Sequence, residues 1–537
     1  MIKKFIIFSE SFGVVNVPYM KSAASLRTAY YLRSQGYEVR TVNHFTVFTQ
    51  PELETIIDGF ASGEKIICCL STSFLRRAHN LREKRFQAFK KGTDNKGNFV
   101  ETNPSPDEGT HWGSGMFEII CDLLKYCKSR GHIVVVGGFE IHNSFFANER
   151  IAKAMGLQTL VNYVDYFIEG KNITILPTIA EGSRMTLPLV INKIPIYKTG
   201  DLLDFTDAAS TPTNSDIVFM GESLPTELST GCIFSCHYCN YGTLGKKKNE
   251  YVRSYESVKQ EFVDNYNNFR VSNYMLTDNI VNDYLEKLHW LIRIKEETGI
   301  DIRWTGYIRA DTIKSKEHAQ LIADSGASSV VMGIESFTKT AGPPVGKMTD
   351  KDKLVKSLTF FREAVGDNCL AHASLIAGLP TESIDQIRQN TEWLESSDGK
   401  YLIDSYLYTA LRIFLPNDNK NDINKARNNP FSDYEVDPAL KGIVWKSPWG
   451  TSTEFMELAS ELNKSYKNDE RVRPGGFSVP FFVSAGIDID RVIKVARHGL
   501  YKNESVKVAL KDEFFSKASY KRNLYKKELL RRSQNEC

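Results

Sequence analysis

Three cysteines stand close together in a chain whose other cysteines are scattered. Cys232, Cys236 and Cys239 lie in the stretch "STGCIFSCHYCNYG", with the spacing C-x-x-x-C-x-x-C. Thiolates are soft ligands that favour zinc or iron–sulfur clusters. A structural zinc site needs a closed set of four ligands, and no fourth cysteine lies nearby. His237 lies between two of the cysteines, where its ring is expected to point elsewhere.

A 4Fe–4S cluster with three thiolate ligands fits this motif better than zinc does. Three irons each take one cysteine and the fourth iron stays open, in contrast to clusters with four cysteine ligands. An open iron can bind a substrate or a cofactor, which is a chemical reason for three thiols. A structural metal knuckle is the alternative.

The cysteine motif follows the first strand of a long series of strand–helix units. Strands are expected in "PTELSTG", "NYMLTDN", "DIRWTGYI", "SSVVMGIES", "CLAHASLIAGLP" and "DSYLYTALRIF", with amphipathic helices between them. Six such units predict a complete or partial TIM-like barrel over residues 222–415. Catalytic groups of such barrels lie at the carboxyl ends of the strands, where the three cysteines are.

The chain before the barrel predicts a second α/β domain. Residues 1–175 contain the runs "KKFIIFS", "YEVRTVN", "KIICCLSTS", "HIVVVGGFE" and "VDYFIEG", with helices between them. Five such strands predict a doubly wound parallel sheet. The first helix is expected to end at Gly36, as its C′ glycine. Residues 176–221 are expected to form a linker, and residues 416–537 a mostly helical extension that ends in a basic helix.

Composition narrows the function classes. The chain has 537 residues, 42% hydrophobic content and a formal net charge of +3, which gives no global electrostatic case for nucleic acid or membrane binding. No apolar run is long enough to span a membrane. The nine cysteines are expected to be reduced thiols in a cytoplasmic protein. The cysteines outside the motif, Cys68 and Cys69 above all, are expected in the core.

The cysteine spacing, with Tyr238 just before the last cysteine, resembles the signature of the radical SAM superfamily. The resemblance implies that the amino and carboxylate groups of S-adenosylmethionine (SAM) chelate the open iron of the 4Fe–4S cluster. One electron then cleaves the sulfonium bond and yields a 5′-deoxyadenosyl radical, which abstracts hydrogen from the substrate. It also implies an external electron donor of the flavodoxin or ferredoxin type.

Four further segments resemble the subgroup that carries an N-terminal cobalamin-binding-type domain. They are "MLTDNIVND", "WTGYIRAD", "VVMGIESF" and "LIAGLPTES". The residues that the resemblance places at SAM or the substrate are Tyr238, Asp278, Arg309, Glu335, Ser336 and Gly378. Glu335 is expected to hold the ribose hydroxyls or the amino group, and Gly378 to let the backbone approach adenine.

Structural roles remain open for the same residues. Glu335 would also suit a carboxylate that caps the next segment. Asp278 and Arg309 would also suit a mutual ion pair, and Gly378 a tight turn.

The first domain resembles the cobalamin-binding domains of that subgroup. The segment "LSTSFL" points to Ser71 and Ser73, and "VVVGGFE" to Gly137 and Gly138, as neighbours of the nucleotide tail of cobalamin. The histidine motif D-x-H-x-x-G is absent from "SESFGVVNVPYMKS", so histidine ligation from this segment is not expected. A flavodoxin-like scaffold without cobalamin is the alternative.

The predicted reaction is methylation of an unactivated carbon, in which one SAM methylates cobalamin and a second supplies the radical. A radical rearrangement, cyclisation or C–S bond formation without functional cobalamin is the runner-up. A non-catalytic metal- or nucleic-acid-binding protein is the rival of another class. The substrate, a small molecule or a nucleotide-like compound, and any catalytic acid or base remain unassigned. The basic insertion at 76–112 is expected to be a solvated loop or a lid.

Overall fold

The computed structural model describes most of the chain in thirteen segments: residues 2–10, 20–72, 116–138, 157–169, 173–183, 188–191, 194–197, 203–239, 251–413, 430–436, 444–467, 478–498 and 503–535. Ser73, the insertion at 76–112 and most of the segment that lacks a histidine motif lie outside the described residues. The chain divides into two compact units. The first comprises residues 1–91, 101–220 and 515–537, and the second comprises residues 92–100 and 221–514.

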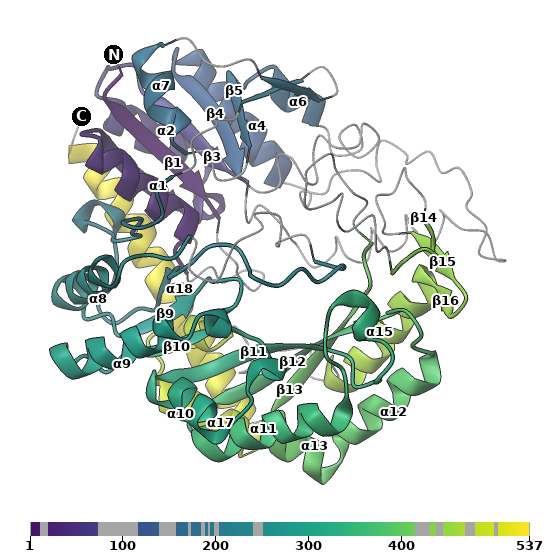
Figure 1. The fold of residues 1–537 in the computed structure, drawn as a ribbon. Coiled ribbons are helices and arrows are strands. Elements are labelled where there is room, and N and C mark those ends of the chain that lie inside the picture. Colours follow the sequence, from purple (N-terminus) through teal and green to yellow (C-terminus); the bar gives the residue numbers. More distant parts are fainter. Residues whose placement is uncertain are drawn as a thin grey trace. The chain divides into compact units, whose positions relative to one another are not determined.

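The first unit is built on a seven-stranded sheet (Figure 1). Its order is β2 (Glu38–Asn43), β1 (Lys4–Ser9), β3 (Ile67–Ser71), β4 (Ile133–Gly138), β5 (Tyr166–Glu169), β7 (Ile194–Tyr197) and β6 (Leu189–Ile191). Every pairing is parallel except that of β6 with β7. The five predicted strands are therefore confirmed, in the doubly wound order 2-1-3-4-5. The segment expected as a linker contributes β6 and β7 to this sheet, because β7 pairs with β5.

Helices cover both faces of the first sheet because alternate residues of its strands point to opposite sides. The helices are α1 (Ala23–Ser34), α2 (Gln50–Ala61), α4 (Met116–Ser129), α6 (Leu157–Val161) and α7 (Ile175–Glu181). Phe8 and Cys68 belong to one buried cluster, and Ile7 and Cys69 belong to the other. Both cysteines are buried, and burial raises the pKa of Cys69 to about 12. The expectation that they are core residues is confirmed.

Local signals mark both ends of the first helix, and the helix ends where the sequence predicts. The Ser22 side chain accepts the Ser25 N–H at the start of α1. Beyond its end Gly36 has φ +81°, a left-handed conformation that favours glycine.

The second unit is built on a six-stranded parallel sheet (Figure 1). Its order is β13 (Ser405–Ala410), β12 (Leu370–Ala377), β11 (Ala327–Glu335), β10 (Arg303–Ile308), β9 (Asn273–Leu276) and β8 (Leu224–Thr226). Neighbours in the sheet are thus neighbours in the chain, as in a barrel. The sheet is ordered from β8 at one edge to β13 at the other, which is the predicted partial barrel.

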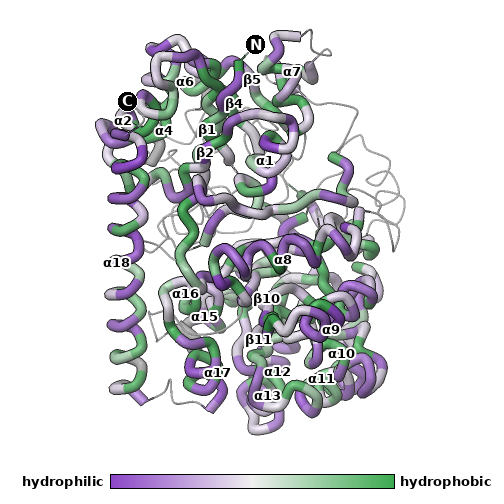
Figure 2. Tube along the Cα trace, turned by 90° about the vertical axis from the view of Figure 1, so that its left-hand side faces the viewer, coloured by the Kyte–Doolittle hydropathy of each residue, from purple (hydrophilic) through white to green (hydrophobic). Residues whose placement is uncertain are grey.

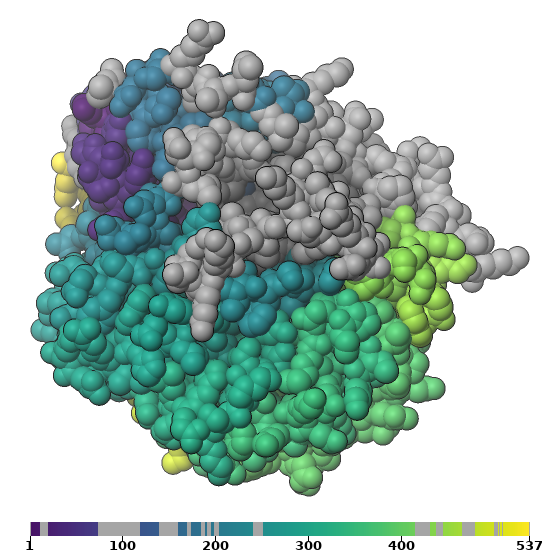
Figure 3. Space-filling model, in the orientation of Figure 1, coloured from purple at the N-terminus to yellow at the C-terminus, as the bar shows by residue number. Residues whose placement is uncertain are grey.

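The helices that alternate with these strands in the chain lie on the outer side of the sheet (Figure 1), and this part of the chain forms the teal-to-green surface in Figure 3. The helices are α8 (Tyr255–Phe269), α9 (Glu286–Thr298), α10 (Lys316–Asp324), α11 (Lys351–Val365), α12 (Ile384–Glu395) and α13 (Ser397–Leu402). Hydrophilic residues recur along α8 and α9 (Figure 2), as expected of helices with one solvent-facing side. Asp350 caps α11 by accepting the Lys353 N–H.

The remaining elements follow β13. They are β14 (Glu435–Val436), β15 (Trp445–Ser447), β16 (Gly450–Thr451), α15 (Ser452–Lys467), α16 (Val479–Ser484), α17 (Ile489–Arg497) and the basic helix α18 (Glu504–Asn535). The end of α18 belongs to the first unit, where Tyr525 and Leu529 join a buried cluster. None of the helices in the described segments is long and apolar enough to cross a membrane.

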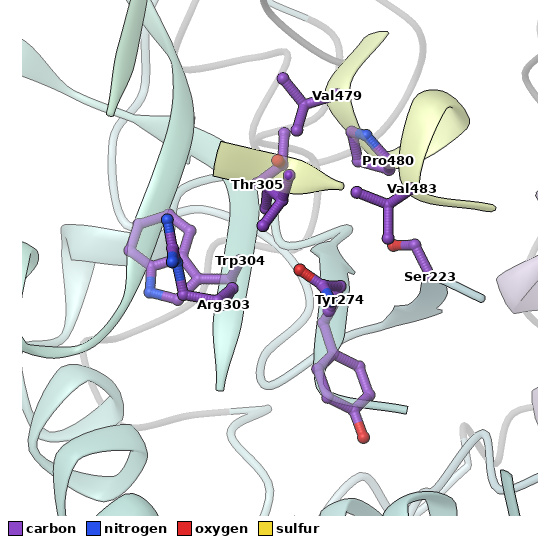
Figure 4. Close-up of a pocket in the computed structure, with 10 residues that line it drawn as sticks. Ser223, Tyr274, Arg303, Trp304, Thr305, Val479, Pro480 and Val483 are labelled. Atoms are coloured by element: carbon purple, nitrogen blue, oxygen red, sulfur yellow. The ribbon is translucent and has the colours of Figure 1, made fainter. Parts of the chain in front are cut away.

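The helix α16 lies beside the amino-terminal ends of β8, β9 and β10 (Figure 4). Ser223 lies just before β8, and its N–H donates to the Ser484 hydroxyl at 3.1 Å. The cavity left between α16 and the strands measures about 10 Å³ and is lined by Tyr274, Thr305 and Val483, among others. It is too small for a substrate, so the chemistry must lie elsewhere in the described part of this unit.

Candidate active site

The loop that carries the three cysteines begins directly after β8 and is held by Asp278, just beyond β9. The Asp278 carboxylate accepts the N–H groups of Leu228 at 2.8 Å and of Ser229 at 2.9 Å. The next residue, Asn279, accepts the Gly231 N–H through its side-chain oxygen at 3.0 Å. Two side chains at one strand end therefore fix the backbone that leads into Cys232.

A buried lysine completes this support. The Lys287 ammonium contacts Asp278 at 3.1 Å, Asp283 at 2.6 Å and the Ser229 hydroxyl at 2.8 Å. The side chains of Lys287, Asp278 and Asp283 are all fully shielded from solvent. Burial raises the pKa of Asp278, and Lys287 opposes this shift. Burial lowers the pKa of Lys287, but the two carboxylates raise it above its usual value.

These contacts bear on the expectation that Asp278 faces SAM. Its carboxylate is buried with 0% exposure and is bonded to the cysteine loop and to Lys287. The geometry favours a positioning role, and the expectation of a cofactor contact receives no support from it. Sequence reasoning missed Lys287, although its spacing of four residues from Asp283 is an ion-pair signal on a helix.

Arg309, which follows β10, reaches a cysteine of the motif. One guanidinium nitrogen donates to Cys236 Sγ at 3.4 Å, and the group stacks on the Phe234 ring at 4.0 Å. Asp311 holds the guanidinium with two hydrogen bonds, of 2.6 and 2.8 Å. The alternative of an Asp278–Arg309 ion pair is therefore wrong, since each residue has another partner.

Neighbouring charges keep this pair ionised. Burial lowers the pKa of Arg309, but the Asp311 carboxylate and the Cys236 sulfur outweigh burial and raise it. Burial raises the pKa of Asp311, but Arg309 and Lys347 bring it below the usual range. A fixed positive charge thus lies against one thiol of the motif.

The loop between β11 and α11 packs against the cysteine loop. The His237 N–H donates to the Val345 carbonyl at 3.1 Å. The Gly346 carbonyl accepts from Cys236 Sγ at 3.7 Å and from Arg309 at 3.3 Å. No motif in the sequence marks this contact, because the two segments are more than 100 residues apart.

Glu335 ends β11 with its carboxylate buried beside the motif. Its backbone has φ +68°, an uncommon value for a residue other than glycine. The carboxylate accepts a hydrogen bond from the Tyr238 hydroxyl and lies 3.6 Å from the Lys347 ammonium. Burial raises the pKa of Glu335, and Lys347 opposes this shift. A strained backbone with a buried charge is typical of functional sites.

The position of the Glu335 carboxylate explains why residue 333 is a glycine. A Cβ there would lie 2.7 Å from the Glu335 Oε1 atom, so glycine leaves Glu335 its place. The Tyr238 hydroxyl has a pKa raised well above its usual value by burial and then by Glu335, so it stays protonated and donates.

Ser336 bonds to a second buried carboxyl group, Glu382. The Ser336 hydroxyl donates to Glu382 Oε1 at 2.5 Å, and the Thr338 hydroxyl donates to the same oxygen at 2.8 Å. The other oxygen, Oε2, is buried without a partner among the described residues. Burial raises the pKa of Glu382 to about 7. Sequence reasoning missed Glu382, although it lies inside the quoted stretch "LIAGLPTES".

Gly378, at the end of β12, is required by packing. Its φ is +96°, and a Cβ would lie 2.7 Å from the Trp445 ring and 3.1 Å from the Phe455 ring. The Tyr434 hydroxyl donates to its carbonyl at 2.9 Å. Packing against Trp445 and Phe455 thus explains the glycine within this unit, and the expectation that Gly378 lets the backbone approach adenine stays a prediction.

The thiols of the motif lie in a partly buried setting. Burial raises the pKa of Cys232 to about 11, and Asp283 adds to the shift. A metal centre reverses this preference, because coordination deprotonates a thiol. Within the described residues, no three histidine, cysteine or acidic side chains meet at the distances of a single-ion site. Three thiols on one loop beside Arg309 are a donor set that fits an iron–sulfur cluster.

In the first unit, Ser71 ends β3 and Gly137 and Gly138 end β4. The Gly137 carbonyl accepts the Thr72 N–H at 2.7 Å. A Cβ at Gly137 would meet Ile168 at 3.6 Å, an ordinary contact, so no neighbour among the described residues demands glycine there. Gly138 has φ +118°, which does favour glycine.

Comparison with known proteins finds a family match within the second unit. Residues 226–394 match the family model of the Radical SAM superfamily. No curated protein matches the chain at a significant level.

Solved structures match over both units. One is the radical S-adenosylmethionine methyltransferase TsrM from Kitasatospora setae with cobalamin and a 4Fe–4S cluster bound (12% identity, TM-score 0.56, 93% of this chain and 100% of that chain). Another is the cobalamin-dependent S-adenosylmethionine radical enzyme OxsB with aqua-cobalamin and S-adenosylmethionine bound (13% identity, TM-score 0.57, 99% and 78%). At this identity the likeness shows the fold.

Proposed function

We propose that this chain, a radical SAM enzyme by its domain at residues 226–394, carries out cobalamin-dependent methylation of an unactivated carbon. The observation that carries the proposal is the meeting of Cys236, Arg309, Glu335 and Tyr238 at the carboxyl ends of the barrel strands. A 4Fe–4S cluster held by Cys232, Cys236 and Cys239 would supply one electron for the reductive cleavage of SAM.

Each side chain has a task in this proposal. Cys232, Cys236 and Cys239 would bind three irons, and Asp278 with Lys287 holds the loop that presents them. Arg309 offers a fixed cation to the Cys236 sulfur. Glu335 is a buried carboxylate suited to the amino group or the ribose hydroxyls of SAM. Tyr238 and Lys347 keep that carboxylate in place.

Cobalamin is the finer part of the proposal. It is supported by the two-unit fold shared with TsrM and OxsB, whose structures contain cobalamin. Gly137 supports it as well, because a Cβ there would make only an ordinary contact with Ile168 at 3.6 Å, so the described residues do not explain why the position is glycine. Cobalamin would supply a methyl carrier in this unit.

The radical step is tested by anaerobic incubation of the reconstituted, reduced protein with SAM. We expect 5′-deoxyadenosine, and we expect alanine replacement of any of the three cysteines to abolish both it and iron binding. Zinc at one per chain without iron or sulfide would refute the proposal and favour the non-catalytic rival.

The cobalamin step is tested by anaerobic titration at micromolar cobalamin. We expect binding, weakened by Gly137→Ala, whose Cβ makes only an ordinary contact inside the protein. The control Gly299→Ala lies in the other unit and should bind normally. A wild-type protein that makes 5′-deoxyadenosine but binds no cobalamin would favour rearrangement, cyclisation or C–S bond formation.

A further inference from the structure

The loop that supports the cysteines on one side is open to solvent on another. Gly346 is exposed, as are Pro343 and Pro344 just before it. Yet the Gly346 carbonyl lies 3.7 Å from Cys236 Sγ. A single backbone carbonyl therefore separates a thiol of the motif from the surface of this unit.

A hollow of about 410 Å³ lies at this point. Lys339, Lys347 and Lys353 line it, together with Gly346 and Asp350. The cysteines, Arg309 and Glu335 are not among its lining residues within the described segments, but it adjoins the site through Gly346, which contacts Cys236, and Lys347, which contacts Glu335. We name it the lysine hollow.

The charge around the lysine hollow is strongly positive. The segment from Lys339 to Lys356 contains five lysines and two aspartates, a formal charge of +3 in 18 residues. The whole chain of 537 residues carries the same net +3. Lys339 has 82% of its side chain exposed, and Lys353 is exposed as well. Asp350 caps α11 and also lies 3.6 Å from the Lys339 ammonium. Lys347 lies 3.6 Å from Glu335, so Lys353 adds the charge that no acid among the described residues offsets at this distance.

We propose that the lysine hollow is the docking site of an acidic one-electron donor protein. This inference rests on the proposed function, which requires an electron at a cluster bound by Cys236. Tunnelling slows steeply with distance, so a donor gains by docking at a point that one backbone carbonyl separates from a thiol, as at Gly346 and Cys236. Complementary charge steers such a partner and raises its association rate. Small, short-lived interfaces are usual for electron transfer.

The test uses the full-length, anaerobically reconstituted protein with reduced flavodoxin, an acidic donor. Stopped-flow absorbance follows cluster reduction in wild type and in Lys339→Glu/Lys353→Glu. A glutamate in the first turn of α11 suits a helix N-terminus, so the variant is expected to fold. The control is Lys494→Glu, an exposed lysine on α17. Reduced methyl viologen, a small donor that needs no docking site, is run in parallel.

At low salt, we expect flavodoxin to reduce the cluster of the double variant at least about tenfold more slowly than that of wild type. The difference should shrink as salt is raised. Lys494→Glu should match wild type, and reduction by methyl viologen should be unchanged in all three proteins.

Equal flavodoxin rates in the double variant and wild type would overturn the inference. An equal loss with both donors would also overturn it, because that result indicates damage to the cluster and not to docking. ATP serves as a probe for small anions. If the double variant were reduced normally by flavodoxin but bound ATP more weakly than wild type, the hollow would be a site for a small anion and the inference would fail. A wild-type protein without iron would refute the proposed function itself, which separates the two failures.

Discussion

Replacement of Lys287 by methionine should expose how much the cysteine loop depends on one buried charge. Methionine keeps most of the length of the lysine side chain but provides no cation. It would leave Asp278 and Asp283 without the ammonium that now lies 3.1 and 2.6 Å from them. Both carboxylates are fully shielded from solvent by the protein.

The cost follows from this shielding. Removing one partner of a buried ion pair typically destabilises a protein by about 3–5 kcal/mol. At ~2–4 °C per kcal/mol, the melting temperature of the second unit should fall by about 6–20 °C. Lys295→Met is the matched control on α9, because that lysine is partly exposed and lies 3.7 Å from Asp301. It should cost less than about 1 kcal/mol.

The loss should also depend on pH. The folded pKa of Asp278 is raised by burial, and Lys287 opposes that shift. A carboxyl with a raised folded pKa loses stability as pH rises from its unfolded pKa towards its folded pKa. Removing Lys287 raises the folded pKa further and widens this interval upwards. The variant should therefore be less impaired at pH 5 than at pH 8.

Tryptophan fluorescence suits the assay because five of the chain's six tryptophans lie between residues 221 and 514. Unfolding of the metal-free protein would be followed at pH 5 and pH 8, with iron per chain measured after reconstitution. Adding Asp283→Asn to Lys287→Met should restore part of the stability. A Lys287→Met protein that melts within about 2 °C of wild type at both pH values would refute the reasoning.

Three further predictions concern other residues of the same unit. Arg309→Gln removes the guanidinium N–H donated to Cys236 Sγ and should lower the midpoint potential of the cluster by tens of mV, on the order of a tenfold change in the ratio of reduced to oxidised cluster. Arg309→Lys keeps the charge and should recover part of this potential, as measured by an EPR redox titration. Glu382→Gln should be near neutral at pH 5 and stabilising at pH 8 by on the order of 3 kcal/mol. Burial raises the pKa of Glu382 to about 7, so the wild-type protein loses stability as pH rises from the unfolded pKa of this group to that value. A difference in melting temperature that does not change with pH would contradict this. Gly378→Ala should lower the free energy of unfolding by more than about 2 kcal/mol, because its Cβ would lie 2.7 Å from the Trp445 ring. The control Gly299→Ala also has a positive φ, +71°, but no atom within 4 Å of its Cβ. It should lower the free energy of unfolding by only about 1 kcal/mol in the same denaturation experiment.

The architecture was predictable because apolar runs and helical periods recur in strict alternation. Parallel strands end at one edge of a sheet, so residues just after β8, β10 and β11 had to meet there. That rule places Cys236, Arg309 and Glu335 together without any knowledge of side chains. The contacts of Arg309 and Glu335 confirm this meeting.

What the sequence did not reveal is which partner each charged residue takes. Lys347 comes from an irregular loop, and Trp445 comes from a segment far beyond Gly378 in the chain. No periodicity marks either contact, because both depend on how loops fold back over the sheet. The strands β6 and β7 were missed for a similar reason, since the short runs that form them lie in a segment rich in proline and threonine.

Asp278 and Glu335 show why a place in a motif does not by itself define a role. Both are acids at the carboxyl ends of barrel strands, Asp278 just beyond β9 and Glu335 at the end of β11, and both are buried. Asp278 bonds to two backbone N–H groups of the cysteine loop, so its negative charge holds the backbone. Glu335 is held by the tips of Tyr238 and Lys347, which are side chains and not backbone groups of the cysteine loop, so its charge is not committed to that backbone.

The difference between these two acids predicts opposite behaviour of two conservative variants. Asp278→Asn should lower iron content after reconstitution, because an amide cannot accept both N–H groups with two carboxylate oxygens. Glu335→Gln should retain iron and instead weaken SAM binding, measured by equilibrium dialysis. If both variants lost iron equally, Glu335 would belong to the loop support as Asp278 does, and its assignment to SAM would fail.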